Sequence, residues 1–163
     1  EIVRQIKKYN PETTVELLIP DMSGKEDLLD IILETKPDVL NHNIETIPEF
    51  YPRVRPAANF MRSIHVLEYA KRQGFKTKSG IMVGFGETEE QMVKTFKALR
   101  DVDCDMLTVG QYLQPTKQHI KVTEYVTPEQ FERYRKIALE LGFKRVNSGP
   151  LVRSSYHAEP IQD

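Results

Sequence analysis

Polar and glycine residues that could bind a ligand gather directly after apolar runs of the sequence. They stand at Asp21, 41–46 (NHNIET), 84–87 (GFGE) and 111–115 (QYLQP). If the apolar runs are parallel strands, these segments lie at one edge of the sheet, where side chains and helix amino ends converge. Each also has a structural explanation: a cap at Asp21, a first-turn charge at Glu87, or a tight turn at Gly84.

Three other residue types would suggest a metal or a nucleophile. His42 has no second His or Cys at a metal-binding spacing, so we expect a hydrogen-bonded loop histidine and assign it no metal. Cys104 has no evident base beside it and is expected to be a small buried hydrophobe. Ser154 lies in the segment 153–156 (RSSY), which lacks the glycine-flanked elbow of a hydrolase nucleophile.

The elements that must position these residues are an alternation of β-branched runs and amphipathic stretches, which predicts an α/β fold with parallel strands. The strand candidates are 15–19, 38–41, 79–84 and 106–112. Capping-box pairs predict helix starts at Ser23 with Glu26, Thr88 with Gln91 and Thr127 with Gln130. Helices that begin near Asn59 and Pro128 are expected to stop at Gly74 and Gly142.

The length of 163 residues and the hydrophobic content of 39% favour one domain over 1–163. A full (β/α)8 barrel needs about 250 residues. Four βα units are therefore half of such a barrel or the larger part of a six-strand partial one, and they leave an open strand edge. Because helical apolar spacing begins at Ile2, we also expect an earlier segment to precede Glu1.

The charge pattern argues against two classes of partner. The net charge is −1 and the Lys and Arg residues are scattered, which gives no footprint for nucleic acid or an acidic membrane surface. No run of eighteen apolar residues predicts a membrane span. The single cysteine, Cys104, excludes an intramolecular disulfide framework, fits a reducing compartment and cannot build a metal cluster unaided.

One segment resembles a cofactor-binding pattern. Residues 80–87 (GIMVGFGE) resemble the G-x-I-x-G-x-x-E pattern of radical S-adenosylmethionine (SAM) enzymes, with Met82 in the usual isoleucine place. Around it, further segments resemble lipoyl synthases in family order: 41–46 (NHNIET), 54–56 (VRP), 77–80 (TKSG), 109–116 (VGQYLQPT) and 149–158 (GPLVRSSYHA). The resemblance runs from about residue 15 to the end of the chain.

This resemblance implies the carboxyl-terminal βα units of a six-strand, half-open radical SAM barrel, with a cluster-contacting tail at about 145–163. Lipoyl synthases use two [4Fe-4S] clusters. One cleaves SAM to a 5'-deoxyadenosyl radical, and the other is consumed as the sulfur source for carbons six and eight of an octanoyl chain on a carrier-protein lysine. The cluster cysteines of the family lie upstream of everything present here, so we do not expect this chain to act alone.

The implied partners are octanoylated lipoyl domains or the glycine cleavage carrier protein, together with iron-sulfur delivery proteins. The implied location is the cytoplasm, or the mitochondrion if the source is eukaryotic. Two rival hypotheses are a radical SAM enzyme without an auxiliary cluster, against which the RSSY segment argues, and a catalytically inert fragment.

The resemblance also implies roles for individual residues. Asn43 and Glu45 match the polar pair that holds the ribose and amino acid part of SAM. Arg55 and Lys78 either neutralise the methionine carboxylate or a buried charge in the pocket, or are solvated surface residues. The adenine is expected to lie against backbone groups near Met82, Gly84, Gln111, Tyr112 and Leu113.

The serine pair of the RSSY segment is the most specific feature, since in the family a serine there completes the coordination of the auxiliary cluster. Adjacent side chains of an extended segment point opposite ways, so Ser154 and Ser155 cannot both face one iron atom. We favour Ser155 and keep Ser154 as the alternative. An oxygen atom is a poor permanent ligand for iron in a soft sulfur environment, which suits a position that must release the iron as the cluster is dismantled.

Overall fold

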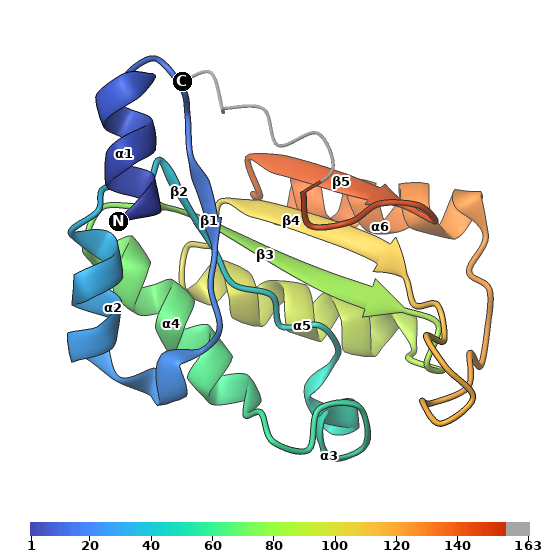
Figure 1. Ribbon diagram of the computed structural model, residues 1–163. Coiled ribbons are helices and arrows are strands. Elements are labelled where there is room, and N and C mark those ends of the chain that lie inside the picture. Colours follow the sequence, from blue (N-terminus) through green and yellow to red (C-terminus); the bar gives the residue numbers. More distant parts are fainter. Residues whose placement is uncertain (156–163) are drawn as a thin grey trace.

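A single parallel sheet organises the molecule, as the computed structural model of the chain shows for residues 1–155 (Figure 1). Its five strands follow one another in the sheet in sequence order. They are β1 (Glu16–Leu18), β2 (Val39–Asn41), β3 (Lys76–Val83), β4 (Met106–Gln111) and β5 (Arg145–Gly149). This order is that of a barrel wall, because the strand order of a doubly wound sheet reverses at a switch point. The α/β prediction is confirmed.

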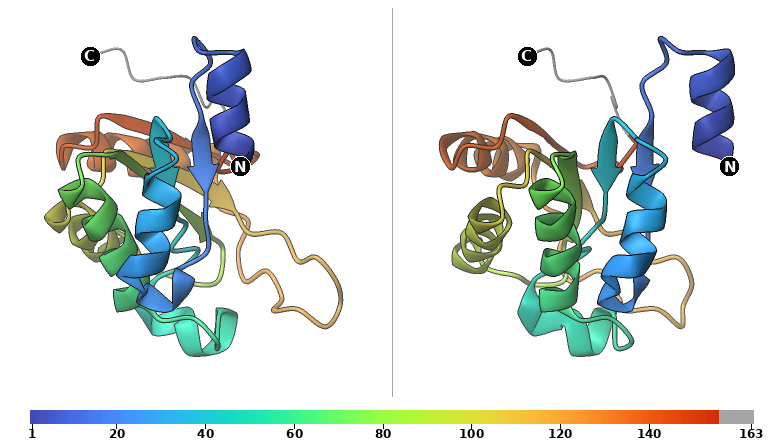
Figure 2. Two further views of the ribbon diagram at one scale, coloured as in Figure 1. Left: turned by 60° about the vertical axis from the view of Figure 1, so that its left-hand side comes forward. Right: turned by 90° about the vertical axis from the view of Figure 1, so that its left-hand side faces the viewer.

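Helices cover one face of this sheet (Figure 2). They are α2 (Glu26–Leu33), α4 (Phe60–Arg72), α5 (Glu89–Asp101) and α6 (Pro128–Glu140). Helix α1 (Ile2–Tyr9) stands apart from them, beyond the β1 edge. Short turns connect the rest: η1 (Met22–Gly24), η2 (Pro48–Phe50) and α3 (Tyr51–Val54). Within residues 1–155, the sheet is therefore a layer with helices on one side only.

The two faces of the sheet differ in chemistry because side chains alternate along each strand. Ile81 and Val109 face the helices and are buried in one cluster with Phe96 and Phe131. Leu40 is buried in a second cluster with residues of α2 and α4. The opposite face is polar, and the register pairs Asn41 with Lys78 and Gly80 with Thr108 across neighbouring strands. The apolar core thus fixes which residues remain on the polar face.

Several local predictions are confirmed. The four expected strands are present, although β3 begins three residues earlier than predicted. Thr88 and Gln91 form a complete capping box, and the Thr127 hydroxyl accepts from the Gln130 amide. Gly74 and Gly142 follow the ends of α4 and α6 with φ values of 87° and 98°.

Two local predictions are wrong. Ser23 does not cap a helix, because it lies inside η1 with φ 54° and α2 begins at Glu26 without a side-chain cap. Residues 145–149 form strand β5 and are not part of a tail. Only Val146 among them is a large apolar residue, so the sequence carries no strand-like hydrophobic pattern there. The rest of the expected tail is described as far as residue 155.

A buried carboxylate ties together the amino-terminal ends of β3 and β4. Asp105 is 1% exposed, and its carboxylate accepts from the Lys71 Nζ at 2.7 Å and from the Thr77 amide at 2.9 Å. The Lys144 Nζ lies 3.1 Å away. Burial raises the pKa of Asp105, but the hydrogen bonds from these three donors outweigh it and hold the pKa below its ordinary value.

We expect Asp105→Asn to lower the free energy of unfolding by about 2–3 kcal/mol at neutral pH, because the two lysines lose a buried anion. A lowered carboxyl pKa stabilises the fold above the unfolded value of about 3.9, and this contribution is lost as the pH falls through the folded pKa. Denaturant titrations at neutral pH and near pH 3 measure the difference, which should shrink in acid. Asp103→Asn is the matched control, since Asp103 is exposed.

Candidate functional site

A cavity of about 240 Å³ lies at the polar face of the sheet, near the carboxyl ends of β3 and β4. It is lined by Asn43, Glu45, Gly80, Ile81, Met82, Thr108, Gly110, Val152, Arg153 and Ser154. Three residues that the sequence predicts as SAM-binding, Asn43, Glu45 and Met82, are thus brought together with one residue of the serine pair. A larger hollow of about 650 Å³ near α3, α4 and α5 contains none of the predicted site residues.

The loop after β2 is held against β3 by backbone hydrogen bonds at Glu45. The Glu45 amide donates to the Gly80 carbonyl at 3.0 Å, and its carbonyl accepts from the Met82 amide at 2.8 Å. Glu45 has φ 68°, a left-handed conformation that non-glycine residues adopt at a cost of about 1–3 kcal/mol. Such strained residues cluster at ligand sites.

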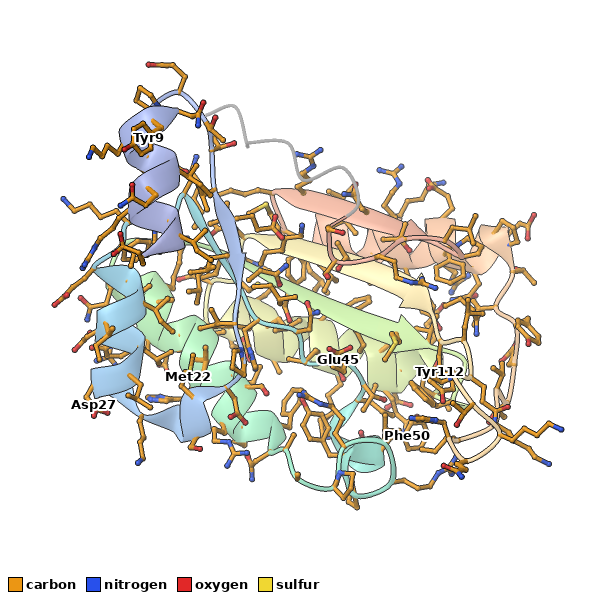
Figure 3. All side chains as sticks on the ribbon, viewed as in Figure 1. Tyr9, Met22, Asp27, Glu45, Phe50 and Tyr112 are labelled. Carbon is orange, nitrogen blue, oxygen red and sulfur yellow. The ribbon has the colours of Figure 1, made fainter. Side chains whose placement is uncertain are left out.

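The Glu45 carboxyl is partly shielded from water. Burial raises its pKa, while the Arg55 guanidinium and a hydrogen bond from Asn43 oppose the rise without cancelling it. Figure 3 shows Glu45 near the arrowheads of β3 and β4, in the same region as Phe50 and Tyr112. A carboxylate with a raised pKa at this position is suited to accept hydrogen bonds from a cationic or hydroxyl-bearing ligand.

Asn43 presents a polar atom that the described residues leave unsatisfied. Its Oδ1 is buried and has no hydrogen-bond partner in residues 1–155. A Cβ placed on Gly80 would lie 2.7 Å from this Oδ1 and 2.8 Å from the Thr108 Oγ1. Asn43 and Thr108 therefore close over Gly80, and only glycine leaves them room. An orphaned buried acceptor beside a carboxylate is what hydroxyl and ammonium donors need.

A second hollow of about 500 Å³ adjoins the first, because Glu45 and Met82 line both. Its other lining residues are Arg53, Val54, Arg55, Tyr112, Gln118, His119 and Ile120. The Arg55 Nη1 donates to the Asn43 carbonyl at 3.4 Å, and the guanidinium lies over the Tyr51 ring at 5.8 Å. Arg55 and Tyr112, both predicted site residues, therefore belong to this second hollow.

Two predicted cofactor-binding residues have side chains that are already engaged. Lys78 is 3% exposed, and its Nζ lies 2.8 and 2.9 Å from the two carboxylate oxygens of Glu16. Gln111 donates to the carbonyls of Tyr112 and Glu124 and accepts from the Val126 amide. Neither lines the two cavities. Lys78 is ion-paired with the partly buried Glu16 outside the two cavities, so its predicted place in the pocket is not seen, and Gln111 anchors the following loop.

The turn after β3 is closed by Glu87. Its carboxylate accepts from the Gly84 amide at 2.6 Å and from the Phe85 amide at 3.0 Å. Gly84 has φ 111°, and a Cβ there would collide with Gln111. With the turn held by these two hydrogen bonds, the centroid of the Phe85 ring lies 4.2 Å from that of the Tyr112 ring. Gly84 and Leu113, which is 48% exposed, line neither cavity.

After β5 the chain folds back across the end of β4. The Val152 amide donates to the Gly149 carbonyl at 3.1 Å, and a Cβ on Gly110 would collide with the Val152 carbonyl. This return brings Ser154 into the lining of the first cavity, whereas Ser155 is exposed and absent from that lining. The geometry therefore favours the alternative ligand, Ser154, over Ser155. Tyr156 lies outside the described residues.

The chain is similar to known proteins in sequence and in fold. The sequence profile of the Radical SAM superfamily matches residues 1–99. The chain belongs to the radical SAM superfamily. The crystal structure of methylornithine synthase superposes on it with a TM-score of 0.68 at 18% identity, covering 99% of this chain and 56% of the other. An identity that low shows a shared fold alone.

Two relatives that are more similar to the chain in sequence are both named lipoyl synthase. The radical SAM chain is 56% identical over 159 residues to a lipoyl synthase from Caldanaerobacter subterraneus subsp. tengcongensis, covering 96% of the chain and 56% of that protein. It is 53% identical over 160 residues to a mitochondrial lipoyl synthase from Nematostella vectensis, covering 98% of the chain and 55% of that protein. The chain thus spans little more than half the length of the curated relatives it matches.

Some residues that line the two cavities were not predicted from the sequence. Thr108 and Gly110 lie on β4 in register with Gly80 and Met82 and face the same cavity. Alternation along the strand would have identified them, because it places Thr108 and Gly110 on the face opposite to Gln111. Arg53 and His119 were also not predicted, because no pattern of spacing in the sequence links them to the other residues that line the hollow.

The remaining candidates for chemistry have structural roles. His42 is buried, and its Nδ1 lies 2.9 Å from the Ile19 carbonyl, so the prediction of a hydrogen-bonded loop histidine is confirmed. Burial lowers the pKa of His42. No group of three or more His, Cys, Asp or Glu residues within 1–155 could hold a metal ion. Within the same range, every helix is too short or too polar to cross a membrane.

Cys104 is fully buried, as the sequence predicts, and burial raises the pKa of its thiol to about 12. Because the thiolate is the reactive form, we expect the native protein to leave Cys104 unmodified by iodoacetamide at pH 8. The same reagent should modify it fully in denaturant. Mass spectrometry of the Cys104 peptide measures both, and rapid native labelling would contradict its burial.

Proposed function

We propose that the protein to which this chain belongs is a lipoyl synthase, which inserts two sulfur atoms into the octanoyl group on a lysine of a carrier protein. One observation carries this proposal: residues of the NHNIET segment and of the RSSY segment, more than one hundred positions apart, line a single cavity. The names and identities of the relatives support it. The chain would form one unit, from 1 to 163, that an upstream segment completes.

The residues present fit SAM. Asn43 contributes an unsatisfied acceptor, Glu45 a carboxylate and Gly80 the clearance that a larger residue would fill. In the proposed site, Asn43 and Glu45 accept from the ribose hydroxyls and the amino group, and Arg55 lies close enough to Glu45 to neutralise a carboxylate of the ligand. Met82 and Tyr112, with the backbone near Gly84, Gln111 and Leu113, frame the adenine.

We also propose two [4Fe-4S] clusters, whose cysteine ligands lie outside this chain. When bound, one cluster with SAM supplies a radical that activates C–H bonds, and the other supplies sulfur. This chain would contribute one oxygen ligand to the sulfur-supplying cluster, from Ser154 or from Ser155. The position of Ser154 in the cavity supports the first choice. In the complete protein the cavity would have to be closed to bulk water, because exclusion of water protects a reactive radical from side reactions.

The proposed substrates are octanoylated lipoyl domains or the glycine cleavage carrier protein. Iron-sulfur delivery proteins would load the clusters, in the cytoplasm or, in a eukaryote, in the mitochondrion. Nucleic acid and membranes are not expected partners. An acyl-lysine arm is thin enough to enter cavities of about 240 and 500 Å³, whereas a folded carrier must remain outside.

The decisive experiment reconstitutes the full-length protein with iron and sulfide and supplies SAM, a reductant and an octanoylated lipoyl domain. We expect product domains that have gained two sulfur atoms, as the dithiol in the presence of the reductant and with two fewer hydrogens after oxidation to the disulfide, measured by mass spectrometry. Cleavage of SAM without any sulfur gain would instead indicate a radical SAM enzyme of a different kind. Absence of both would favour an inert protein.

A further inference from the structure

The opening of the second hollow is bordered by an excess of positive charge. The two segments that form it, 48–58 and 113–123, together contain four Lys or Arg residues and one acidic residue, Glu49, in a chain of net charge −1. We name the basic rim as Arg53, Arg55, Lys117, His119 and Lys121. Arg53, Arg55 and His119 line the hollow itself, and Lys117 and Lys121 flank the lining residues Gln118 and Ile120.

These charges are largely uncompensated. Lys117 and Lys121 are exposed and have no ion-pair partner among residues 1–155, and the Arg53 guanidinium lies over the Phe50 ring, 5.7 Å from its centroid. Glu45 is the one acidic residue among the groups that line the hollow. Several other basic side chains are paired with carboxylates, as Arg62 is with Asp21 and Arg133 with Glu89. The basic rim therefore presents a positive field at the entrance to the site.

The rim is also held in place, although the segment 113–127 contains no helix or strand. The Tyr112 hydroxyl donates to the Ile120 carbonyl at 2.8 Å, and the Thr123 amide donates to the Gly84 carbonyl at 2.8 Å. Gln114 donates to the His119 carbonyl at 2.8 Å. Figure 2 shows this loop standing out from the strand ends. A fixed, projecting loop binds with a smaller loss of conformational freedom.

We propose that the basic rim docks an acidic surface of the folded carrier protein, next to its acylated lysine, so that the lysine arm enters the second hollow. This inference rests on the proposed function. Charge complementarity supports it, because carboxylates around the modified lysine would meet four cations at the mouth of a pocket with apolar walls of Val54, Tyr112 and Ile120. A nucleic acid would instead need a continuous track of cations along its phosphates.

The test compares two substrates with two double variants of the full-length, cluster-loaded protein. The substrates are an octanoylated lipoyl domain and a short, uncharged octanoyl-lysyl peptide. Lys117→Glu/Lys121→Glu reverses the rim, and Lys25→Glu/Lys97→Glu reverses two other exposed lysines as the matched control. Arg53→Glu, on the other side of the opening, should act in the same direction as the rim variant.

We expect the rim variant to raise the KM for the lipoyl domain about ten-fold or more and to weaken its dependence on salt, while the KM for the peptide changes less than about two-fold. The control variant should behave as the wild type with both substrates. An unchanged KM for the lipoyl domain in the rim variant would overturn the docking surface, although the function would stand.

If the wild type modifies neither substrate, the proposed function fails instead, and calorimetric binding of the octanoylated lipoyl domain still tests the rim. Binding that the rim variant weakens about ten-fold would support the surface. Equal binding by both proteins, or tighter rim-dependent binding of duplex DNA or anionic vesicles than of the lipoyl domain, would overturn it.

Discussion

Ser154→Ala is expected to lower lipoyl formation about 100-fold in the full-length protein while SAM cleavage continues. Ser154 lines the cavity that contains Asn43 and Glu45, and in the proposed function its hydroxyl oxygen would complete a cluster held by ligands from elsewhere. Losing a residue that supports a metal ligand typically costs about 10-fold to 100-fold in affinity or activity, so loss of a ligand itself should reach at least the upper end of that range. Mass spectrometry of the carrier and chromatography of 5'-deoxyadenosine measure the two steps separately.

Ser155→Ala is the matched control, since Ser155 is exposed and absent from the cavity lining. It should retain most of the lipoyl formation. Ser154→Cys should restore cluster binding, because thiolate is the preferred ligand of iron in such clusters, and iron content and electron paramagnetic resonance would report this apart from activity. Loss of lipoyl formation in Ser155→Ala but not in Ser154→Ala would return the assignment to Ser155.

The choice between the two serines illustrates what a sequence leaves undetermined. Alternation predicts that Ser154 and Ser155 face opposite ways, but which one faces inward depends on the return of the chain across β4. That return is fixed by contacts of Val152 with Gly149 and Gly110. Because β5 contains a single large apolar residue, the sequence predicts neither this strand nor the turn that follows it.

Other features could be predicted from the sequence because they depend on local rules. The apolar runs of β2 and β4 and the capping box at Thr88 follow from burial and from hydrogen bonding within one turn. Lys78 and Gln111 show the limit of such rules. The partner of Lys78 is Glu16, which lies 62 residues away in the sequence. The Gln111 side chain forms hydrogen bonds with carbonyl and amide groups of the next loop. A polar residue near a strand end therefore becomes a site candidate only when its partners are known.

Gly80→Ala is expected to weaken SAM binding about 10-fold or more. A methyl group at this position would lie 2.7 Å from the Asn43 Oδ1 and 2.8 Å from the Thr108 Oγ1, distances at which these atoms must move apart. Thr108 is on a central strand and Asn43 hydrogen-bonds Glu45, so any relaxation displaces the proposed ligand-binding pair. Overpacking of this kind costs about 1–3 kcal/mol, which corresponds to roughly 5-fold to 150-fold in an equilibrium constant.

Gly149→Ala separates this steric effect from a general cost of alanine in a strand. A Cβ on Gly149 would meet only the Val152 Cγ2, at an ordinary contact distance of 3.4 Å. We expect its SAM affinity, measured by calorimetry on the cluster-loaded protein, to stay within about two-fold of the wild type, since such a contact needs no repacking. Wild-type affinity in Gly80→Ala, with a normal unfolding transition, would mean that Asn43 and Thr108 can move apart without affecting the ligand. In that case the orphaned Asn43 oxygen would not mark the binding site.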